Sequence, residues 1–238
     1  LSNDEITLYD KDDDAVKTLS LGDKKRAFPL AEIPEYVKNA FIDTEDRRFY
    51  KHGGIDLKGM ARATKNNLIA RSFKEGASTI SQQLVKNTHL TQEKTIRRKL
   101  KELKLTLALE KRYTKDEILT LYLNTVSFGE GTFGIESAAQ KYFSTTATRL
   151  SVPEAATLIG LLKGPSRVHP DRTLQRRNTV ITQMIKYDYL TEEEGETLKQ
   201  EKLQLRFKPL NHYSGLAPYL REQIRQDAVK LIAEFNEA

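Results

Sequence analysis

Two glutamates in charged surroundings are the residues of this chain best suited to catalysis. Glu45 opens the run EDRRFYKHGG, residues 45–54, in which acidic, basic, aromatic and imidazole groups follow one another. Glu102 ends the basic run RRKLKE, residues 97–102. A carboxylate held in a cleft can accept the proton of a hydroxyl group and so turn it into a nucleophile. Taken singly, each run also has a purely structural interpretation. Residues 45–54 could be a helix terminus with solvated charges, and residues 97–102 could form a structural ion pair on an amphipathic helix.

A third segment has side chains suited to binding sugars. It is the run GASTISQQLVKN, residues 76–87. In a helix, one of its faces carries hydroxyl, amide and amino groups, from Thr79, Gln83, Lys86 and Asn87. Such a face can donate and accept many hydrogen bonds with sugar hydroxyls and amides. A merely solvated face would be richer in Glu and Lys than in Gln, Ser and Thr.

Cations gather in a fourth segment, which follows residue 160. They are Lys163, Arg167, Arg172, Arg176 and Arg177. Guanidinium and ammonium groups bind phosphate oxygens well, so this segment suits a phosphorylated ligand. Taken alone, a basic solvated surface explains it as well.

Helices must position these groups. Apolar residues Val37, Phe41 and Ile42 predict a helix that runs up to Glu45 and stops near residues 52–54. Ser78 or Thr79 can cap a second helix that continues through residue 87.

A helix from about Thr95 to Arg112 carries Glu102. Its Leu100 face and its Leu105 face are both apolar, so the sequence predicts a helix buried at the centre of the domain. Arg98 lies one turn before Glu102, which would place a carboxylate and a cation together in an interior or cleft.

The rest of the chain is also predicted to be mainly α-helical. Capping boxes open further helices at Thr114, Ser151 and Thr191. Three glycines, Gly129, Gly131 and Gly134, predict a tight connection before a helix through Ala138 and Tyr142. Residues 66–77 have weak periodicity and predict a mobile loop, and residues 5–20 alternate like a short N-terminal β-hairpin.

Bulk composition restricts the classes of function. The chain has 238 residues, a net charge of +6 and no cysteine. Its length fits one domain with a smaller lobe, its charge indicates an anionic partner, and the lack of cysteine excludes thiolate chemistry. The sequence shows neither a bilayer-spanning apolar run nor a signal peptide.

Seven motifs, taken in order, resemble those of the peptidoglycan glycosyltransferases, the polymerising module of bifunctional class A penicillin-binding proteins. They are EDRRFYKHGGID (45–56), GASTISQQLVKN (76–87), RRKLKE (97–102), KDEILTLYLN (115–124), FGEGTFGIESAAQKYF (128–143), LLKGPS (161–166) and RRNTVITQM (176–184). Thr120 stands where the fourth motif usually has a glutamate, so no carboxylate role is carried over to that position.

This resemblance implies a reaction. The family polymerises lipid II, a lipid-linked disaccharide pentapeptide, onto a lipid-linked glycan strand, with inversion and release of polyprenyl pyrophosphate. It implies that Glu45 is the general base. Glu102 would assist the pyrophosphate leaving group, directly or through a divalent cation (Mg or Mn), or would orient Arg98 and Lys99. No cofactor is expected to be obligatory.

The resemblance also implies a set of substrate-binding residues. They are Asp46, Arg48, Phe49, His52, Ser78, Thr79, Gln82, Gln83, Lys86, Asn87, Arg98, Lys99, Asn124, Lys163, Arg176 and Arg177.

The family's fold is a large lysozyme-like helical lobe with a smaller, membrane-associated jaw lobe. We therefore expect a hairpin or linker over residues 1–28, the glycosyltransferase domain over 29–210, and the start of a connection to a transpeptidase domain over 211–238. The chain has no Ser-x-x-Lys motif. The expected location is the outer face of the bacterial cytoplasmic membrane, with the membrane anchor outside this chain and other cell-wall synthesis proteins as partners.

Two other functions compete with this interpretation. A lysozyme-like hydrolase would use a similar lobe and a cleft glutamate, but it would not need the phosphate-type cations. A nucleic-acid-binding protein would use the basic run from Lys94 to Lys104. That helix is predicted to be buried and lacks the interleaved aromatic residues of single-strand binders, so no nucleic-acid partner is expected.

Overall fold

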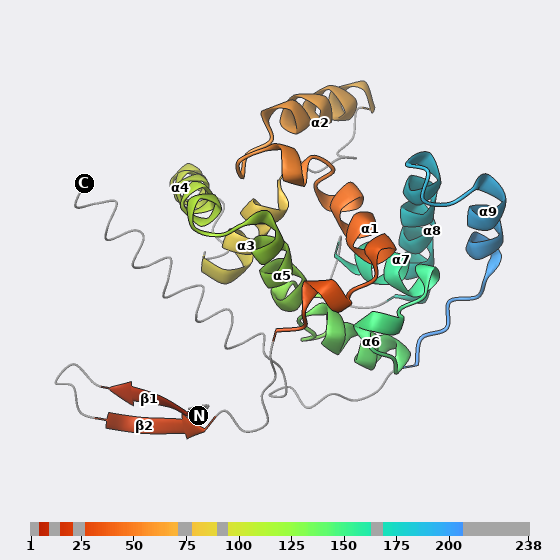
Figure 1. Ribbon diagram of the computed structural model, residues 1–238. Coiled ribbons are helices and arrows are strands. Elements are labelled where there is room, and N and C mark those ends of the chain that lie inside the picture. Colours follow the sequence, from red (N-terminus) through yellow and green to blue (C-terminus); the bar gives the residue numbers. More distant parts are fainter. Residues whose placement is uncertain are drawn as a thin grey trace.

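The protein is mainly helical (Figure 1), in agreement with the sequence-based prediction. This computed structural model describes residues 5–9, 15–20, 27–70, 78–89, 95–162 and 169–206. Its α-helices are α1 (Glu35–Glu45), α2 (Leu57–Ala70), α3 (Ile80–His89), α4 (Ile96–Arg112), α5 (Lys115–Thr125), α6 (Ile135–Phe143), α7 (Val152–Leu161), α8 (Pro170–Lys186) and α9 (Glu192–Gln200). Short 3-10 turns occupy Leu30–Glu32, Phe49–Lys51 and Ala147–Arg149.

Two strands precede the helices. Strand β1 (Glu5–Tyr9) pairs with strand β2 (Ala15–Ser20) in antiparallel register, with Ile6 opposite Leu19 and a register shift between Leu8 and Tyr9. The turn expected around residues 11–14 lies outside the described residues.

The hydrophobic core surrounds α7. This helix packs against α1, α6 and α8, and every one of its residues from Ala155 to Leu161 is buried. The buried faces of α1 and α5 complete the core with Phe41, Leu119 and Tyr122. Because α1 is anchored along its length in this core, its last residue, Glu45, has a fixed place at the end of a rigid element.

Helix α4 has the predicted bounds, and Thr95 caps it by accepting a hydrogen bond from the Arg98 backbone N–H at 3.1 Å. The prediction that it is buried on both sides is wrong. Ile96 is 82% exposed and Leu100 57% exposed, whereas Leu105 and Leu109 are buried. The reason is tertiary: α4 lies at the edge of the helical body and packs against α3 and α5 (Figure 1), which cover only its second apolar stripe.

The loop predicted over residues 66–77 is only partly described by the structure. Residues 66–70 form the last part of α2, so the prediction was wrong there, and residues 71–77 lie outside the described residues. The polar residues Lys65 and Asn66 mask the helical periodicity at that point.

The capping-box motifs in the sequence correctly predicted where three helices start. Thr114, Ser151 and Thr191 each form the predicted capping box, in which the cap and a glutamate three residues later exchange hydrogen bonds. The connection before α6 also forms as predicted. Gly129, Gly131 and Gly134 all have positive φ, and a Cβ at Gly134 would lie 2.6 Å from the carbonyl oxygen of Asn124.

Replacing Thr191 by Ala is expected to lower the free energy of unfolding by about 1 kcal/mol, because α9 loses its side-chain cap. Thr197→Ala is the matched control on the same exposed helix, since the Thr197 hydroxyl only donates back to the Glu193 carbonyl. Urea denaturation followed by circular dichroism measures both. Equal stability of the two variants would contradict the assigned cap.

Candidate active site

Glu45 lies at the C-terminal end of α1, where the Asp46 backbone N–H closes the helix on the Ile42 carbonyl at 2.7 Å. Its half-buried side chain lines a pocket of about 350 Å³. This pocket lies between the ends of α1 and α3, the start of α2 and the packed pair α7 and α8. Of the predicted site residues, it also contains Asp46, Ser78, Thr79 and Arg176.

The charges around this pocket are mixed. Its other charged lining residues are Asp43, Arg47, Asp56 and Arg62. With Glu45, Asp46 and Arg176, four carboxylates and three guanidinium groups line one cavity. Such a lining can hold a phosphorylated sugar while keeping a carboxylate available for proton transfer.

Glu45 is held from α3 and α5. The Gln83 Nε2 donates a hydrogen bond to Glu45 Oε2 at 3.0 Å, and the Tyr122 hydroxyl donates to Gln83 Oε1 at 3.2 Å. Burial, followed by the nearby Glu45 and Asp46 carboxylates, raises the pKa of Tyr122 well above its usual value. The phenol therefore stays protonated and remains a donor. Gln83 was predicted to belong to the site, whereas no role was predicted for Tyr122.

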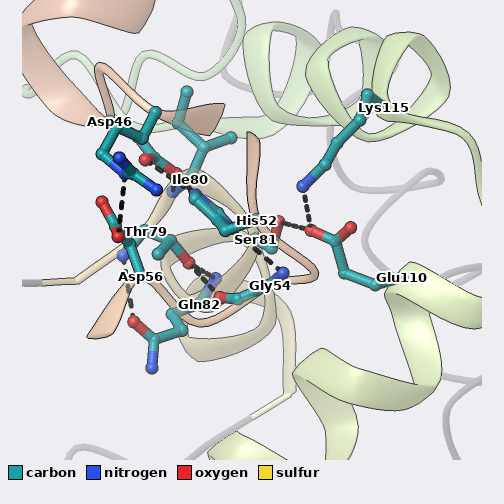
Figure 2. A network of polar contacts seen from close by, with 11 residues as sticks. Asp46, His52, Gly54, Asp56, Thr79, Ile80, Ser81, Gln82, Glu110 and Lys115 are labelled. Atoms are coloured by element: carbon teal, nitrogen blue, oxygen red, sulfur yellow. Dashed lines mark hydrogen bonds and ion pairs between the residues drawn. The ribbon is translucent and has the colours of Figure 1, made fainter. Parts of the chain in front are cut away.

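Asp46 and His52 form a buried pair beside Glu45. His52 Nε2 lies 2.9 Å from Asp46 Oδ1, and both side chains are almost fully buried. The Gly54 backbone N–H donates to His52 Nδ1 at 3.1 Å, so the ring proton lies on Nε2 and is donated to Asp46. Asp46 also accepts from the Ile80 backbone N–H at 3.0 Å, at the start of α3. Figure 2 shows this cluster.

Thr79 and Gln82 cap α3 by a reciprocal exchange. The Gln82 N–H donates to Thr79 Oγ1 at 3.1 Å, and the Thr79 N–H donates to Gln82 Oε1 at 3.0 Å. The Thr79 hydroxyl also donates to the Gly54 carbonyl at 2.7 Å (Figure 2). Both side chains are buried and engaged in this way, whereas Ser78 is exposed at the pocket. These contacts give Thr79 and Gln82 the task of fixing the α3 terminus against the Asp46–His52 pair.

Arg48 and Phe49 also hold the segment between α1 and α2. Arg48 Nε pairs with Asp56 Oδ1 at 3.2 Å, and Phe49 is fully buried, with Lys115 Nζ 4.4 Å from its ring centroid. Asp56 was not among the predicted site residues, and its only signal in the sequence was its place at the end of the first motif.

A further ion-pair network lies on the other side of α3. The buried Ser81 hydroxyl donates to Glu110, which also accepts from Lys115 Nζ at 2.7 Å (Figure 2). This network joins α3 to α4 and α5. Lys86 and Asn87 extend from α3 as exposed side chains.

Glu102 is 1% exposed on α4, and its carboxylate is paired with two cations. Arg98 Nη1 lies 3.0 Å from Oε2, and Lys99 Nζ contacts Oε1. None of the three lines the Glu45 pocket. Helix α4 therefore holds a separate ion-paired cluster, in which a buried carboxylate fixes the charged heads of two cations.

The residues around Glu102 do not fit a divalent cation. One carboxylate already paired with two cations is a poor donor set for Mg or Mn, which need several oxygen ligands. Within the described ranges, no group of three or more His, Asp or Glu side chains could hold a metal ion.

The remaining predicted residues lie apart from one another. Asn124 accepts from the Phe28 N–H at 2.7 Å and donates to the Phe28 carbonyl at 3.0 Å, so it ties the chain before α1 to α5. Lys163 lies outside the described residues.

The predicted Arg176–Arg177 phosphate pair is split. Arg176 lines the Glu45 pocket, whereas Arg177 is buried, donates to the Lys199 carbonyl at 2.9 Å and lines a different pocket. The two side chains separate because consecutive residues of a helix point about 100° apart. Burial lowers the pKa of Arg177.

Comparisons with known proteins agree on one family. The sequence model of the transglycosylase family matches residues 12–185. Penicillin-binding protein 1A of Escherichia coli (strain K12) is 41% identical over 211 residues, which make up 86% of this chain and 25% of that protein. Penicillin-binding protein 1A of Aquifex aeolicus (strain VF5) is 44% identical over 182 residues, 74% of this chain and 25% of that protein.

A solved structure of penicillin-binding protein 1A from Haemophilus influenzae aligns with a TM-score of 0.46 and 22% identity, over 95% of this chain and 24% of that chain. The chain thus spans about a quarter of the length of the relatives that it matches.

Proposed function

This chain belongs to the transglycosylase family of class A penicillin-binding proteins, and we propose that it polymerises lipid II into peptidoglycan glycan strands with Glu45 as the general base. The observation that carries the proposal is a glutamate at the rigid end of α1, held by Gln83 and facing a pocket that also contains Arg176. The predicted activity comes from the family, and the geometry supports the role of Glu45.

The proposed step begins at the 4-hydroxyl of the acceptor sugar. Its oxygen attacks the anomeric carbon of the lipid-linked donor strand from the face opposite the pyrophosphate. The hydroxyl proton passes to the Glu45 carboxylate while the carbon–oxygen bond to the pyrophosphate breaks. The pyrophosphate leaves with the bonding electron pair, and the configuration at the anomeric carbon inverts.

Departure of the pyrophosphate needs charge stabilisation more than a strong acid. Arg98 and Lys99 suit this task because Glu102 fixes their charged heads. We assign to Glu102 the task of orienting these two cations. Arg176 can contact a phosphate from the side of the Glu45 pocket, and by family resemblance Lys163 would add a further cation.

The substrate's prenyl tail must stay in lipid while its sugars reach the pocket, so part of the domain must face the membrane. Helix α2 supports this proposal: Leu57 is 73% and Leu68 78% exposed, with Lys58 and Lys65 on the same helix. We place α2 in the proposed jaw lobe, on the outer face of the cytoplasmic membrane. In the part of the chain that the structure describes, no helix is long and apolar enough to cross a bilayer.

Incubation of the purified chain with lipid II in detergent tests the proposal. We expect long glycan on a gel, with one polyprenyl pyrophosphate released for each glycosidic bond formed. In a parallel assay, purified cell wall without any lipid-linked precursor should remain intact. Digestion of that wall without any polymerisation would instead identify a lysozyme-like hydrolase.

A further inference from the structure

Tyr122 is a buried phenol close to the proposed base, and it has no part in the mechanism above. It comes from α5 and is fully buried in the core. Its hydroxyl donates a hydrogen bond to Gln83 Oε1 at 3.2 Å. An apolar contact alone would be served as well by phenylalanine, so the hydroxyl needs a separate explanation.

The amide of Gln83 can take two orientations that differ by a half-turn about its last bond. One presents the NH₂ group to Glu45, and the other presents the carbonyl oxygen, which would repel a carboxylate. The Tyr122 oxygen could accept a hydrogen bond, but its buried hydroxyl hydrogen needs an acceptor, so the hydroxyl favours the orientation with the Gln83 oxygen toward Tyr122. That orientation leaves Nε2 to donate to Glu45 Oε2 at 3.0 Å.

We infer that Tyr122 is a positioning residue: its hydroxyl fixes the Gln83 amide so that Gln83 holds the Glu45 carboxylate in the direction needed for proton transfer. This inference rests on the proposed function, in which Glu45 is the base. The three side chains come from α5, α3 and α1. We call this chain of hydrogen bonds, from Tyr122 through Gln83 to Glu45, the relay; it joins three helices at one oxygen of the Glu45 carboxylate.

Other charged groups also face Glu45 and contribute to any pH dependence. They line the same pocket from α1, from the segment after α1, from α2 and from α8: Asp43, Asp46, Arg47, Asp56, Arg62 and Arg176. Tyr122→Phe leaves all of them in place, so a changed pH profile in that variant reports on the relay.

Tyr122→Phe is the test, and Tyr142→Phe is the matched control. Tyr142 is equally buried, and its hydroxyl donates to the backbone carbonyls of Phe128 and Gly129 at 3.0 and 3.1 Å. Both variants lose one buried phenol hydroxyl, but only the first loses a contact to Gln83. In steady-state assays with lipid II, we expect kcat to fall about tenfold in Tyr122→Phe, with its acid limb moved to higher pH and KM nearly unchanged.

A second measurement does not depend on activity. The side-chain amide resonances of Gln83, observed by heteronuclear NMR, should move in Tyr122→Phe and stay in place in Tyr142→Phe. In a Gln83→Met background, which removes the amide, Tyr122→Phe should cause no further loss of rate. Unmoved Gln83 resonances in Tyr122→Phe, or losses that multiply in the double variant, would overturn the relay.

Failure of the proposed function would look different from failure of the relay. If Glu45→Gln polymerises lipid II normally, Glu45 is not the base. The positioning role of Tyr122 is then also refuted, even if the Gln83 resonances show that the hydrogen bonds exist. If Glu45→Gln is inactive but Tyr122→Phe matches the control in rate, pH profile and resonances, the base stands and the relay is refuted.

Discussion

Glu45→Gln is expected to abolish polymerisation of lipid II, with a fall in kcat of at least about a hundredfold. The amide is close in size to the carboxylate but cannot accept a proton at neutral pH. The fold should survive, because Glu45 is half-buried at a helix end and its helix is anchored by Val37 and Phe41. Gel analysis of the glycan and single-turnover kinetics measure the effect.

Glu35→Gln is the control for this variant. Glu35 is the first residue of the same helix, and its exposed side chain makes a surface ion pair with Lys38. It should polymerise at the wild-type rate. A Glu45→Gln variant that is as active as Glu35→Gln would show that another group accepts the proton.

Glu102→Gln is expected to lower kcat/KM for lipid II by tenfold to about a hundredfold, the effect of losing about 2 kcal/mol of charged hydrogen bonding. The amide oxygen can still accept from one cation, but the NH₂ group then faces the other, so Arg98 and Lys99 lose their fixed positions. If Glu102 orients cations that stabilise the departing pyrophosphate, most of the loss appears in kcat and the pH profile keeps its shape. A moved basic limb of the pH profile would instead assign it a proton-transfer role.

Glu196→Gln separates this effect from the general loss of an ion pair. Glu196 pairs with Lys199 three residues later, at 2.6 Å, in the same spacing as Glu102 and its preceding partner Lys99. It lies on the surface of α9, where such pairs contribute little to stability. We expect wild-type kinetics from it, and a loss equal to that of Glu102→Gln would remove the case for a special site on α4.

Interactions between near neighbours in the chain were predictable from sequence. A capping box needs only a hydroxyl residue and a glutamate three positions on, so Thr114, Ser151 and Thr191 were identified without knowledge of the fold. The helix bearing Glu102 was predicted for the same reason, since its cap and its 3.6-residue pattern are local.

Properties that depend on the surroundings of a helix were not predictable. Apolar residues on two faces of α4 suggested complete burial, yet Leu100 is exposed, because α3 and α5 are the helices that pack against α4 among the described residues and they cover its other side. The sequence pattern around Tyr122 is that of an ordinary core residue. It does not reveal the hydrogen bond from the Tyr122 hydroxyl to Gln83, which lies on a helix distant in the sequence. Arg176 and Arg177 are adjacent in sequence, but packing of α8 against α7 and α9 divides them between two environments.

The contact between Asp46 and Ile80 has a topological consequence. After Asp46 the chain packs Phe49 into the core and forms α2, and α3 then begins at Ile80, whose backbone N–H reaches the Asp46 carboxylate at 3.0 Å. The two ends of the segment that contains α2 are thus joined by this hydrogen bond, which places the Asp46 carboxylate at the positive N-terminal end of α3. Because its ends are fixed there, substitutions or length changes near the exposed part of α2 can be accommodated without shifting α1 or α3. If α2 faces the membrane as proposed, this contact would let it adapt to bilayers of different thickness or composition while the Glu45 carboxylate stays in place.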